Sequence, residues 1–217
     1  FPEIIRYVLV QRNCIVMILY HGSPAGGLTE LTPFLSEHGK PYIYFASTPV
    51  IALLYAVKPV PKPFSFYPYG FDKNCVVYSE YFEDAFFDLY KGKTGYLYEC
   101  VDLKHVDNPT QINCVYTCIE KVKVDKVTKI PDLYVYFKEQ EEKCLFRIKQ
   151  RTEISDKEMQ RILNELKKDI EANNLKHFPE HPMSIFIQNH FPNAWNAKTD
   201  VKIYGIQALN LTDQIQT

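Results

Sequence analysis

The hydrophobic positions in the first two thirds of the chain form short runs that indicate β-strands. The segment 14–23, CIVMILYHGS, is continuously apolar before its polar end, which is typical of a strand buried on both faces. His21 is therefore expected at the end of this strand. Further strands are predicted at 42–47, 75–80, 94–103 and 113–130, where Val, Ile, Tyr and Thr are frequent.

Two short helices are predicted between these strands. The segment 47–57 begins with an N-cap at Ser47 or Thr48 and has a proline in its first turn. The segment 81–93 predicts a second helix that a glycine closes. Between 58 and 74 prolines alternate with aromatic residues, so we expect a long surface excursion there and no central strand.

The last third of the chain has a helical pattern. Ser155, followed three residues later by Glu158, forms a capping box ahead of an amphipathic segment that extends to about Asn173. Its apolar positions share one helical face and are Met159, Ile162, Leu163, Leu166 and Ile170. We expect this stripe to be buried against the strand domain of the same chain, because an exposed row of this kind forms an adhesive patch. A short helix at 182–191 and a closing strand at 201–206 complete the pattern.

Strands in the first two thirds and helices in the last third indicate an α+β fold. We assign residues 1–150 to a strand-rich domain and residues 151–217 to a helical C-terminal extension packed on it. The length of 217 residues suits one large domain, or one domain with a smaller appendage.

Composition and charge exclude several classes of protein. Hydrophobic residues make up 46% of the chain and charged residues 24%, which is typical of a folded globular protein and excludes a disordered one. The net charge of −1 argues against binding to nucleic acid or to an anionic membrane. The apolar run is too short to cross a bilayer, and we expect a cytoplasmic protein. The six cysteines form no C-x-x-C pair, so most are interpreted as small buried hydrophobic residues.

Common nucleotide-binding and metal-binding motifs are absent from the sequence. It contains no G-x-G-x-x-G after a strand, no G-x-x-x-x-G-K-[ST], no H-E-x-x-H and no G-x-S-x-G. His177, His181 and His190 form a loose group in the last third. Pro179 and Pro182 break the helix that would align the first two, so we expect no metal site.

The segments LYHGS at 19–23 and GKPYIYFASTPVIALLYA at 39–56 together resemble the ADP-ribosyltransferase fold. The likeness is to its diphtheria-toxin-like branch, which includes the poly(ADP-ribose) polymerases and the rifampin ADP-ribosyltransferases, and it covers roughly residues 15–130. These families pair H-G-[ST] at a strand end with a tyrosine on the next strand, which leads directly into a helix. A third residue, often acidic, lies on a later strand.

The resemblance implies a split β-sheet core with NAD as substrate. We therefore expect the side chains of His21, Tyr44 and one acidic residue to converge on one cleft between the two split sheets. It places His21–Gly22–Ser23 in the first position and Tyr44 in the second. The stretch NPTQINCVYTCIEKVKV is similar to the corresponding part of the rifampin-modifying enzymes, which places Glu120 in the acidic position. By the same resemblance Ser23 and Tyr55 also line the pocket.

The residue types suit cleavage of the bond between nicotinamide and ribose. This cleavage develops positive charge on the ribose, as in glycoside hydrolysis, and a carboxylate such as that of Glu120 stabilises the charge. The aromatic face of Tyr44 can stack on the nicotinamide ring. The backbone of Gly22 can hold the carboxamide, and neutral His21 can hydrogen-bond a ribose hydroxyl.

Each of these residues also has a structural interpretation. His21 suits a strand end, Gly22 a turn and Tyr44 an aromatic core. Glu120 opens the segment EKVKVDK, whose alternating charges are typical of a solvated edge strand.

Glu99 is the rival acid. It shares a face of its predicted strand with Leu97 and Val101, where a carboxylate without a function or a partner is costly. Glu120 ranks first, because the resemblance supports it.

We therefore expect NAD-dependent ADP-ribosyl transfer, or NAD glycohydrolysis, with an acceptor that is a small molecule or a protein. One alternative is a catalytically inactive copy of the fold that serves as a binding or interaction module. Another is NAD-dependent removal of a 2′-phosphate from RNA, which requires basic residues around the phosphate. In LYHGSPAGGL the only basic residue is His21, so this activity ranks last.

Overall fold

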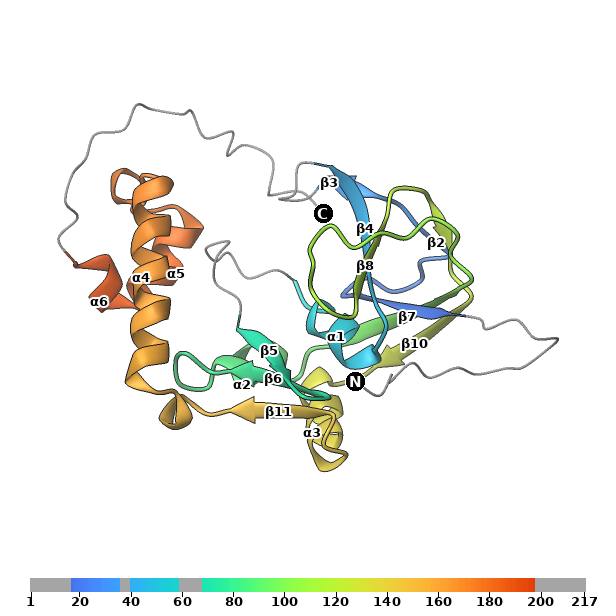
Figure 1. Ribbon diagram of the computed structural model, residues 1–217, viewed down its shortest axis with the longest axis horizontal. Coiled ribbons are helices and arrows are strands. Elements are labelled where there is room, and N and C mark those ends of the chain that lie inside the picture. Colours follow the sequence, from blue (N-terminus) through green and yellow to red (C-terminus); the bar gives the residue numbers. More distant parts are fainter. Residues whose placement is uncertain (1–16, 36–39, 59–67, 198–217) are drawn as a thin grey trace. The chain divides into compact units, whose positions relative to one another are not determined.

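The computed structural model describes residues 17–35, 40–58 and 68–197 of the chain (Figure 1). These residues form a mixed α+β structure, as the sequence predicts. Most of them belong to one of two compact units. Residues 17–58 and 69–151 form the first, the sheet unit, and residues 152–197 belong to the second, the helical unit. Packing of the helical extension on the sheet unit stays a prediction.

Most strands of the sheet unit are short. In chain order its elements are β1 (Ile18–Ser23), β2 (Glu30–Leu31), β3 (Phe34–Leu35), β4 (Pro41–Ala46), α1 (Pro49–Leu54), β5 (Tyr69–Asp72), β6 (Cys75–Ser79), α2 (Ala85–Tyr90), β7 (Gly95–Val101), β8 (Val115–Cys118), β9 (Val122–Lys123), β10 (Lys126–Ile130), α3 (Leu133–Glu142) and β11 (Phe146–Lys149). The largest sheet has the order β10-β7-β1-β4-β3, and β8 pairs with β4 as well. A second sheet has the order β11-β6-β5, and β2 pairs with β9.

Two hydrophobic clusters cover opposite faces of the largest sheet. Neighbouring residues of a strand point to opposite faces, so Leu19 and Phe45 lie on one face and Tyr20 and Ala46 on the other. The first face belongs to a cluster with Tyr98, and the second packs with residues of α1, α2 and α3. Figure 1 shows α1 beside the large sheet and α3 beside β11, and both pairs are in contact.

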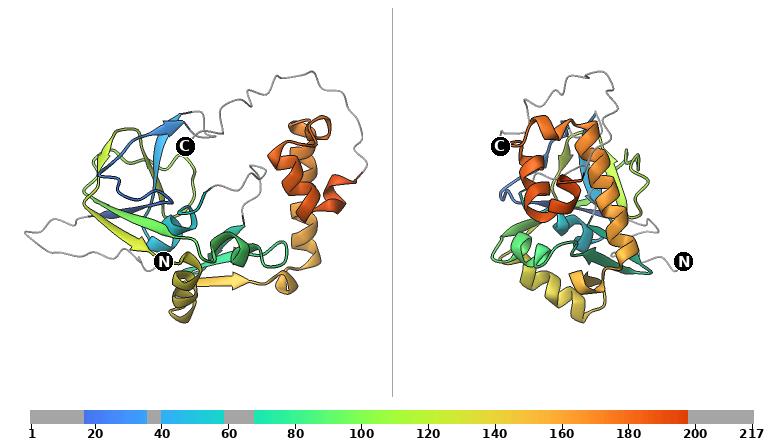
Figure 2. Two further views of the ribbon diagram at one scale, coloured as in Figure 1. Left: turned by 180° about the vertical axis from the view of Figure 1, so that it is seen from behind. Right: turned by 90° about the vertical axis from the view of Figure 1, so that its left-hand side faces the viewer.

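The helical unit has an amphipathic helix at its centre. Its elements are α4 (Asp156–Ala172), η2 (Leu175–His177), α5 (Pro182–His190) and α6 (Pro192–Trp195), and the short helix η1 (Arg151–Glu153) lies at the unit boundary. Ser155 caps α4 as predicted, with its hydroxyl accepting from the Glu158 N–H at 3.2 Å. The buried members of the predicted stripe are Ile162, Leu166 and Ile170. Within the unit α4 contacts α6 and η2, and Figure 2 shows the other helices of the unit lying beside α4.

The structure differs from the sequence predictions at several elements. Thr48, and not Ser47, caps α1, with its hydroxyl accepting from Ile51 N–H at 3.4 Å. The predicted excursion contains β5, which is tolerated because β5 is an edge strand of its sheet. Helix α3 and strand β11 were not predicted. The expected strand at 201–206 lies outside the described residues.

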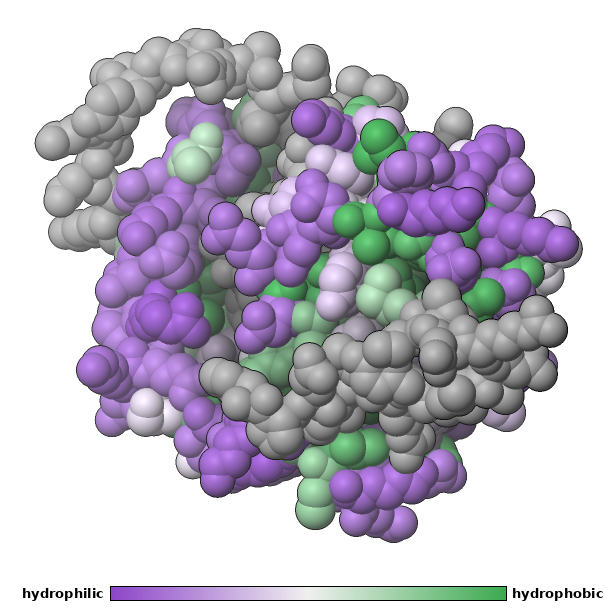
Figure 3. Space-filling model, turned by 45° about the vertical axis from the view of Figure 1, so that its right-hand side comes forward, coloured by the Kyte–Doolittle hydropathy of each residue, from purple (hydrophilic) through white to green (hydrophobic). Residues whose placement is uncertain are grey.

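Buried and exposed side chains also depart from the sequence expectation in places. Cys100 and Cys118 are buried, whereas Cys144 is exposed. Figure 3 shows hydrophobic residues at the surface between hydrophilic ones. Phe34, at 54% exposure, is one of the exposed large hydrophobic residues of the molecule. Within the described ranges no helix has the length and apolarity needed to cross a membrane.

Candidate functional site

Strand β1 has two different edges. With β7 it forms a continuous antiparallel ladder from Ile18 to Ser23. With β4 it forms a single pair, Tyr20 with Ala46, although β1 continues to Ser23 and β4 begins five residues before Ala46, at Pro41. The largest sheet is therefore split between β1 and β4 beyond Tyr20.

The backbone of Gly22 points into this split. In an antiparallel ladder, alternate residues bond the same neighbouring strand. The Asp102 N–H donates to the Met17 carbonyl at 3.2 Å, so residues 17, 19, 21 and 23 bond toward β7. The N–H and C=O of Gly22 therefore point toward β4. Its partner there would be Tyr44, but this pair is not formed, so at least one of the two exchanged hydrogen bonds is missing.

His21 bridges the split with its side chain. Its Nδ1 lies 2.8 Å from the carbonyl oxygen of Tyr44. A carbonyl only accepts, so Nδ1 carries the proton and Nε2 of the neutral ring is an acceptor. Burial lowers the pKa of His21 below 6.5, and the hydrogen bond to Tyr44 opposes this shift. His21 is therefore neutral at pH 7, as a hydroxyl-binding role requires.

The face of β1 that carries Gly22 is covered by α1. A Cβ placed on Gly22 would lie 1.9 Å from the backbone oxygen of Ala52, which is far inside van der Waals contact. Gly22 lies within β1 and not in a turn, so the turn interpretation is wrong. A glycine is required here because the helix backbone approaches the strand closely.

The side chains of His21 and Tyr44 lie on opposite faces of the sheet. The His21 ring packs against Phe45 and Tyr98, at centroid distances of 6.2 and 6.3 Å. Tyr44 alternates with Phe45 along β4, so its ring lies on the face of Gly22. It contacts Phe34 at 6.1 Å. The expectation that the His21 and Tyr44 side chains converge on one cleft is therefore wrong: the His21 ring reaches only the backbone of Tyr44, and the Tyr44 ring lies on the other face of the sheet.

Glu99 has a structural partner. On β7 it lies opposite Tyr20, on the face away from the His21 ring. Its carboxylate bonds the Lys126 ammonium of β10 at 2.7 Å. The cost of placing this carboxylate between apolar neighbours is offset by an ion pair across the strands.

Glu120 is exposed and follows the end of β8. Its backbone N–H lies 3.4 Å from the Cys118 sulfur. No contact recorded for the described residues joins its carboxylate to His21. Glu120 is not within an edge strand, because β9 begins two residues later at Val122.

Ser23 and Tyr55 have local contacts. The Ser23 hydroxyl accepts from the Ala25 N–H at 3.1 Å. Tyr55 ends α1, is 55% exposed and has its hydroxyl 2.6 Å from that of Tyr69 on β5. The contacts described for these two residues do not join them to His21.

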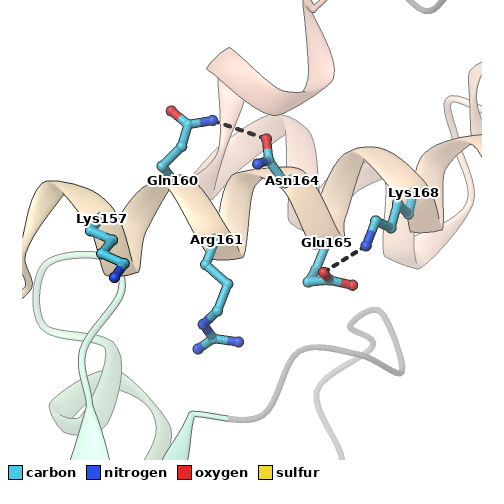
Figure 4. A pocket seen from close by; sticks show the side chains of 6 residues that line it. All are labelled: Lys157, Gln160, Arg161, Asn164, Glu165 and Lys168. Carbon is cyan, nitrogen blue, oxygen red and sulfur yellow. Dashed lines mark hydrogen bonds and ion pairs between the residues drawn. The ribbon is translucent and has the colours of Figure 1, made fainter.

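The helical unit provides no comparable site. His181 caps α5 with Nδ1 accepting from the Met183 N–H at 3.2 Å, and the His190 ring packs on Phe186. In the part of the chain that the structure describes, no group of three His, Cys, Asp or Glu side chains could hold a metal ion. Figure 4 shows a pocket lined by Lys157, Gln160, Arg161, Asn164, Glu165 and Lys168. All six lie on α4, and two pairs of them bond each other, which is typical of a hydrated helix face.

Two further buried residues, Tyr98 and Glu80, were not singled out from the sequence. Tyr98 is fully buried beside His21, and its hydroxyl bonds the chain that follows β1. Glu80 is a buried carboxylate that accepts from the Phe86 N–H at 2.9 Å, and burial raises its pKa. In the sequence, the alternation of YLYECV places Tyr98 on the face opposite to Glu99, and this is the one signal that could have identified Tyr98.

Comparison of the chain with known protein families, with characterised proteins and with solved structures finds no match.

Proposed function

We propose that the sheet unit binds NAD at the split between β1 and β4 and transfers its ADP-ribose to an acceptor or to water. One observation carries this proposal: the ladder between β1 and β4 stops at Tyr20, so that Gly22 directs backbone groups into a gap that neutral His21 spans. A primary carboxamide has one face with an N–H donor and a carbonyl acceptor. It can therefore form with Gly22 the hydrogen bonding that the missing ladder pair with Tyr44 leaves open.

The remaining groups suit the other parts of NAD. The Tyr44 ring lies on the Gly22 face, where it can stack on the nicotinamide. Nε2 of His21 is left as an acceptor for a ribose hydroxyl, because Nδ1 is engaged by Tyr44.

The reaction breaks the bond between ribose C1′ and the nicotinamide nitrogen. The bonding electron pair leaves with the nitrogen, which gives neutral nicotinamide and a positively charged ribose. An oxygen of the acceptor or of water then bonds C1′ and releases its proton to a carboxylate or to solvent. Glu120 is the proposed carboxylate, because Glu99 is paired with Lys126 on the other face.

A binding module without catalysis is the second candidate. It is favoured by the same contacts, since the recorded ones place neither Glu99 nor Glu120 beside His21. Such a module would bind NAD in the split and leave it intact.

Calorimetry with NAD and chromatography for released nicotinamide separate these functions. The proposal expects binding at millimolar NAD or below, release of nicotinamide, and loss of both in His21→Ala. His105→Ala is the matched control, because His105 is exposed and lies between β7 and β8. Binding without release supports the module, and the absence of binding at millimolar NAD contradicts both functions.

A further inference from the structure

The turn that follows β1 is held by two tyrosines of β7. The Tyr98 hydroxyl donates to the Ala25 carbonyl at 2.7 Å and accepts from the Leu28 N–H at 3.4 Å. The Tyr96 ring lies against Gly26, where an added Cβ would be 2.5 Å from the ring. We call residues 24–28 the 24–28 turn. The hydrogen bonds of Tyr98 and the packing of the Tyr96 ring both hold it in place.

The same tyrosine supports His21. Tyr98 is the ladder partner of His21 on β7, and their rings pack at 6.3 Å. Leu28 packs on the cluster that contains Tyr98 and Phe45, which is the face of the His21 ring. One fully buried side chain thus contacts the imidazole with its ring and the 24–28 turn with its hydroxyl.

We infer that Tyr98 is a positioning residue of the proposed site, which fixes the 24–28 turn and the His21 ring on one face of β1. A tyrosine is suited to this role, because its ring fills the cluster while its hydroxyl reaches backbone groups of the turn. The importance of this role for ligand binding rests on the function proposed above. The effect on His21 itself does not, since it can be measured without ligand.

The test compares Tyr98→Phe with Tyr90→Phe. Tyr90 is a matched control, because it is also buried and its hydroxyl donates to a backbone carbonyl, that of Leu54, at 2.7 Å. Each variant loses one hydroxyl, so we expect similar decreases in Tm. Only Tyr98→Phe should release the turn, admit water to His21 and raise the His21 pKa toward 6.5 in an NMR titration. It should also weaken NAD binding about fivefold, the effect of one hydrogen bond.

The outcomes separate this inference from the proposed function. A His21 titration in Tyr98→Phe that matches the parent overturns the positioning role, whatever the affinity for NAD. A shifted titration in a protein that does not bind NAD supports the positioning role and overturns the proposed function. If Tyr98→Phe does not fold, Gly26→Ala displaces the turn from the Tyr96 side, with Gly70→Ala as its control, and the same shift or its absence decides.

Discussion

Strand β1 forms a continuous ladder with β7 on one side and a single pair with β4 on the other. Strand β7 is in turn held on its other edge by β10: Lys126 bonds Glu99 at 2.7 Å, and Asp125, just before β10, accepts from the Val101 N–H at 2.9 Å. On the β4 side, the residue next to His21 is a glycine, whose ladder pair with Tyr44 is not formed. The imidazole of His21 bonds the Tyr44 carbonyl there instead. The difference is that one edge of β1 is fully paired along the strand and the other is paired at one residue, and the proposed function places its ligand at the second edge.

The incomplete edge has an energetic cost. Gly22 is buried and its ladder pair with Tyr44 is not formed, and each buried backbone group that this leaves without any partner costs about 1–3 kcal/mol. Proteins retain such groups mainly where a function needs them or where water satisfies them. The close fit of α1 on Gly22 prevents the strand from moving to close the gap without repacking the helix.

The largest expected effect is that of Gly22→Ala. The new Cβ would lie 1.9 Å from a backbone oxygen of α1, which cannot rotate away as a side chain can. Overpacking of this kind costs roughly 1–3 kcal/mol, and we expect the upper end or more. Urea unfolding monitored by circular dichroism measures the change.

Gly70→Ala is the control for this substitution. Gly70 lies in β5, and an added Cβ would meet no atom within 4 Å. Its unfolding midpoint should stay close to that of the parent. Equal stability of the two variants would show that α1 does not hold β1 at Gly22.

Glu120→Gln tests the chemistry at the incomplete edge. If its carboxylate stabilises the charged ribose, the rate of nicotinamide release should fall at least about 100-fold, with little change in NAD affinity. Glutamine keeps the size of the side chain and removes its charge. Unchanged release would remove Glu120 from the mechanism, and loss of affinity in proportion to the rate would make it a binding residue.

The pH dependence of stability should report the half-buried His21 at the split. Its pKa in the folded protein is below the ordinary 6.5, so the unfolded chain binds more protons between these two values. This contribution to stability is complete above pH 6.5 and is lost as the pH falls toward the folded pKa. The slope there is at most about 1.4 kcal/mol per pH unit.

His21→Gln is the variant that isolates this slope. Denaturant unfolding of the parent and of the variant between pH 5 and pH 8 should give curves that converge at the acidic end. A constant difference between the two across this range would mean that His21 titrates normally.

Much of the fold could be predicted because its signals are local. The strand that carries His21 follows from an apolar run, and the cap of α4 follows from the hydroxyl of Ser155 three residues before Glu158. Helix α3 was missed because LYVYF is rich in residues that favour strands. Its signal was Asp132, whose carboxylate accepts from the Val135 N–H at 3.2 Å.

The candidate site was less accessible to the sequence for a physical reason. The motif placed His21 and Tyr44 together, but only the ladder register shows that their rings lie on opposite faces of the sheet. The partner of Glu99 is Lys126, 27 residues away, which no periodicity within one strand can show. Likewise, a glycine is required at position 22 because the backbone of Ala52 in α1 approaches it, and the residues adjacent to Gly22 in the sequence do not reveal this contact.

The smallest expected effect concerns the strand behind the complete edge, where Glu99→Gln in β7 removes the charge that pairs with Lys126 of β10. The Lys126 side chain is 65% exposed and that of Glu99 19%, so solvent screens much of the interaction. Exposed pairs of this kind contribute little to stability, so we expect a small loss, less than that of Gly22→Ala. NAD binding and nicotinamide release should match the parent, because Glu99 lies on the face away from the His21 ring.

Lys126→Met is the control and should give a similar small loss of stability. If the ion pair is what stabilises, the double variant should lose less stability than the two single variants added together. A large fall in nicotinamide release in Glu99→Gln, with stability unchanged, would make Glu99 the acid of the site and remove the functional distinction between the two edges of β1.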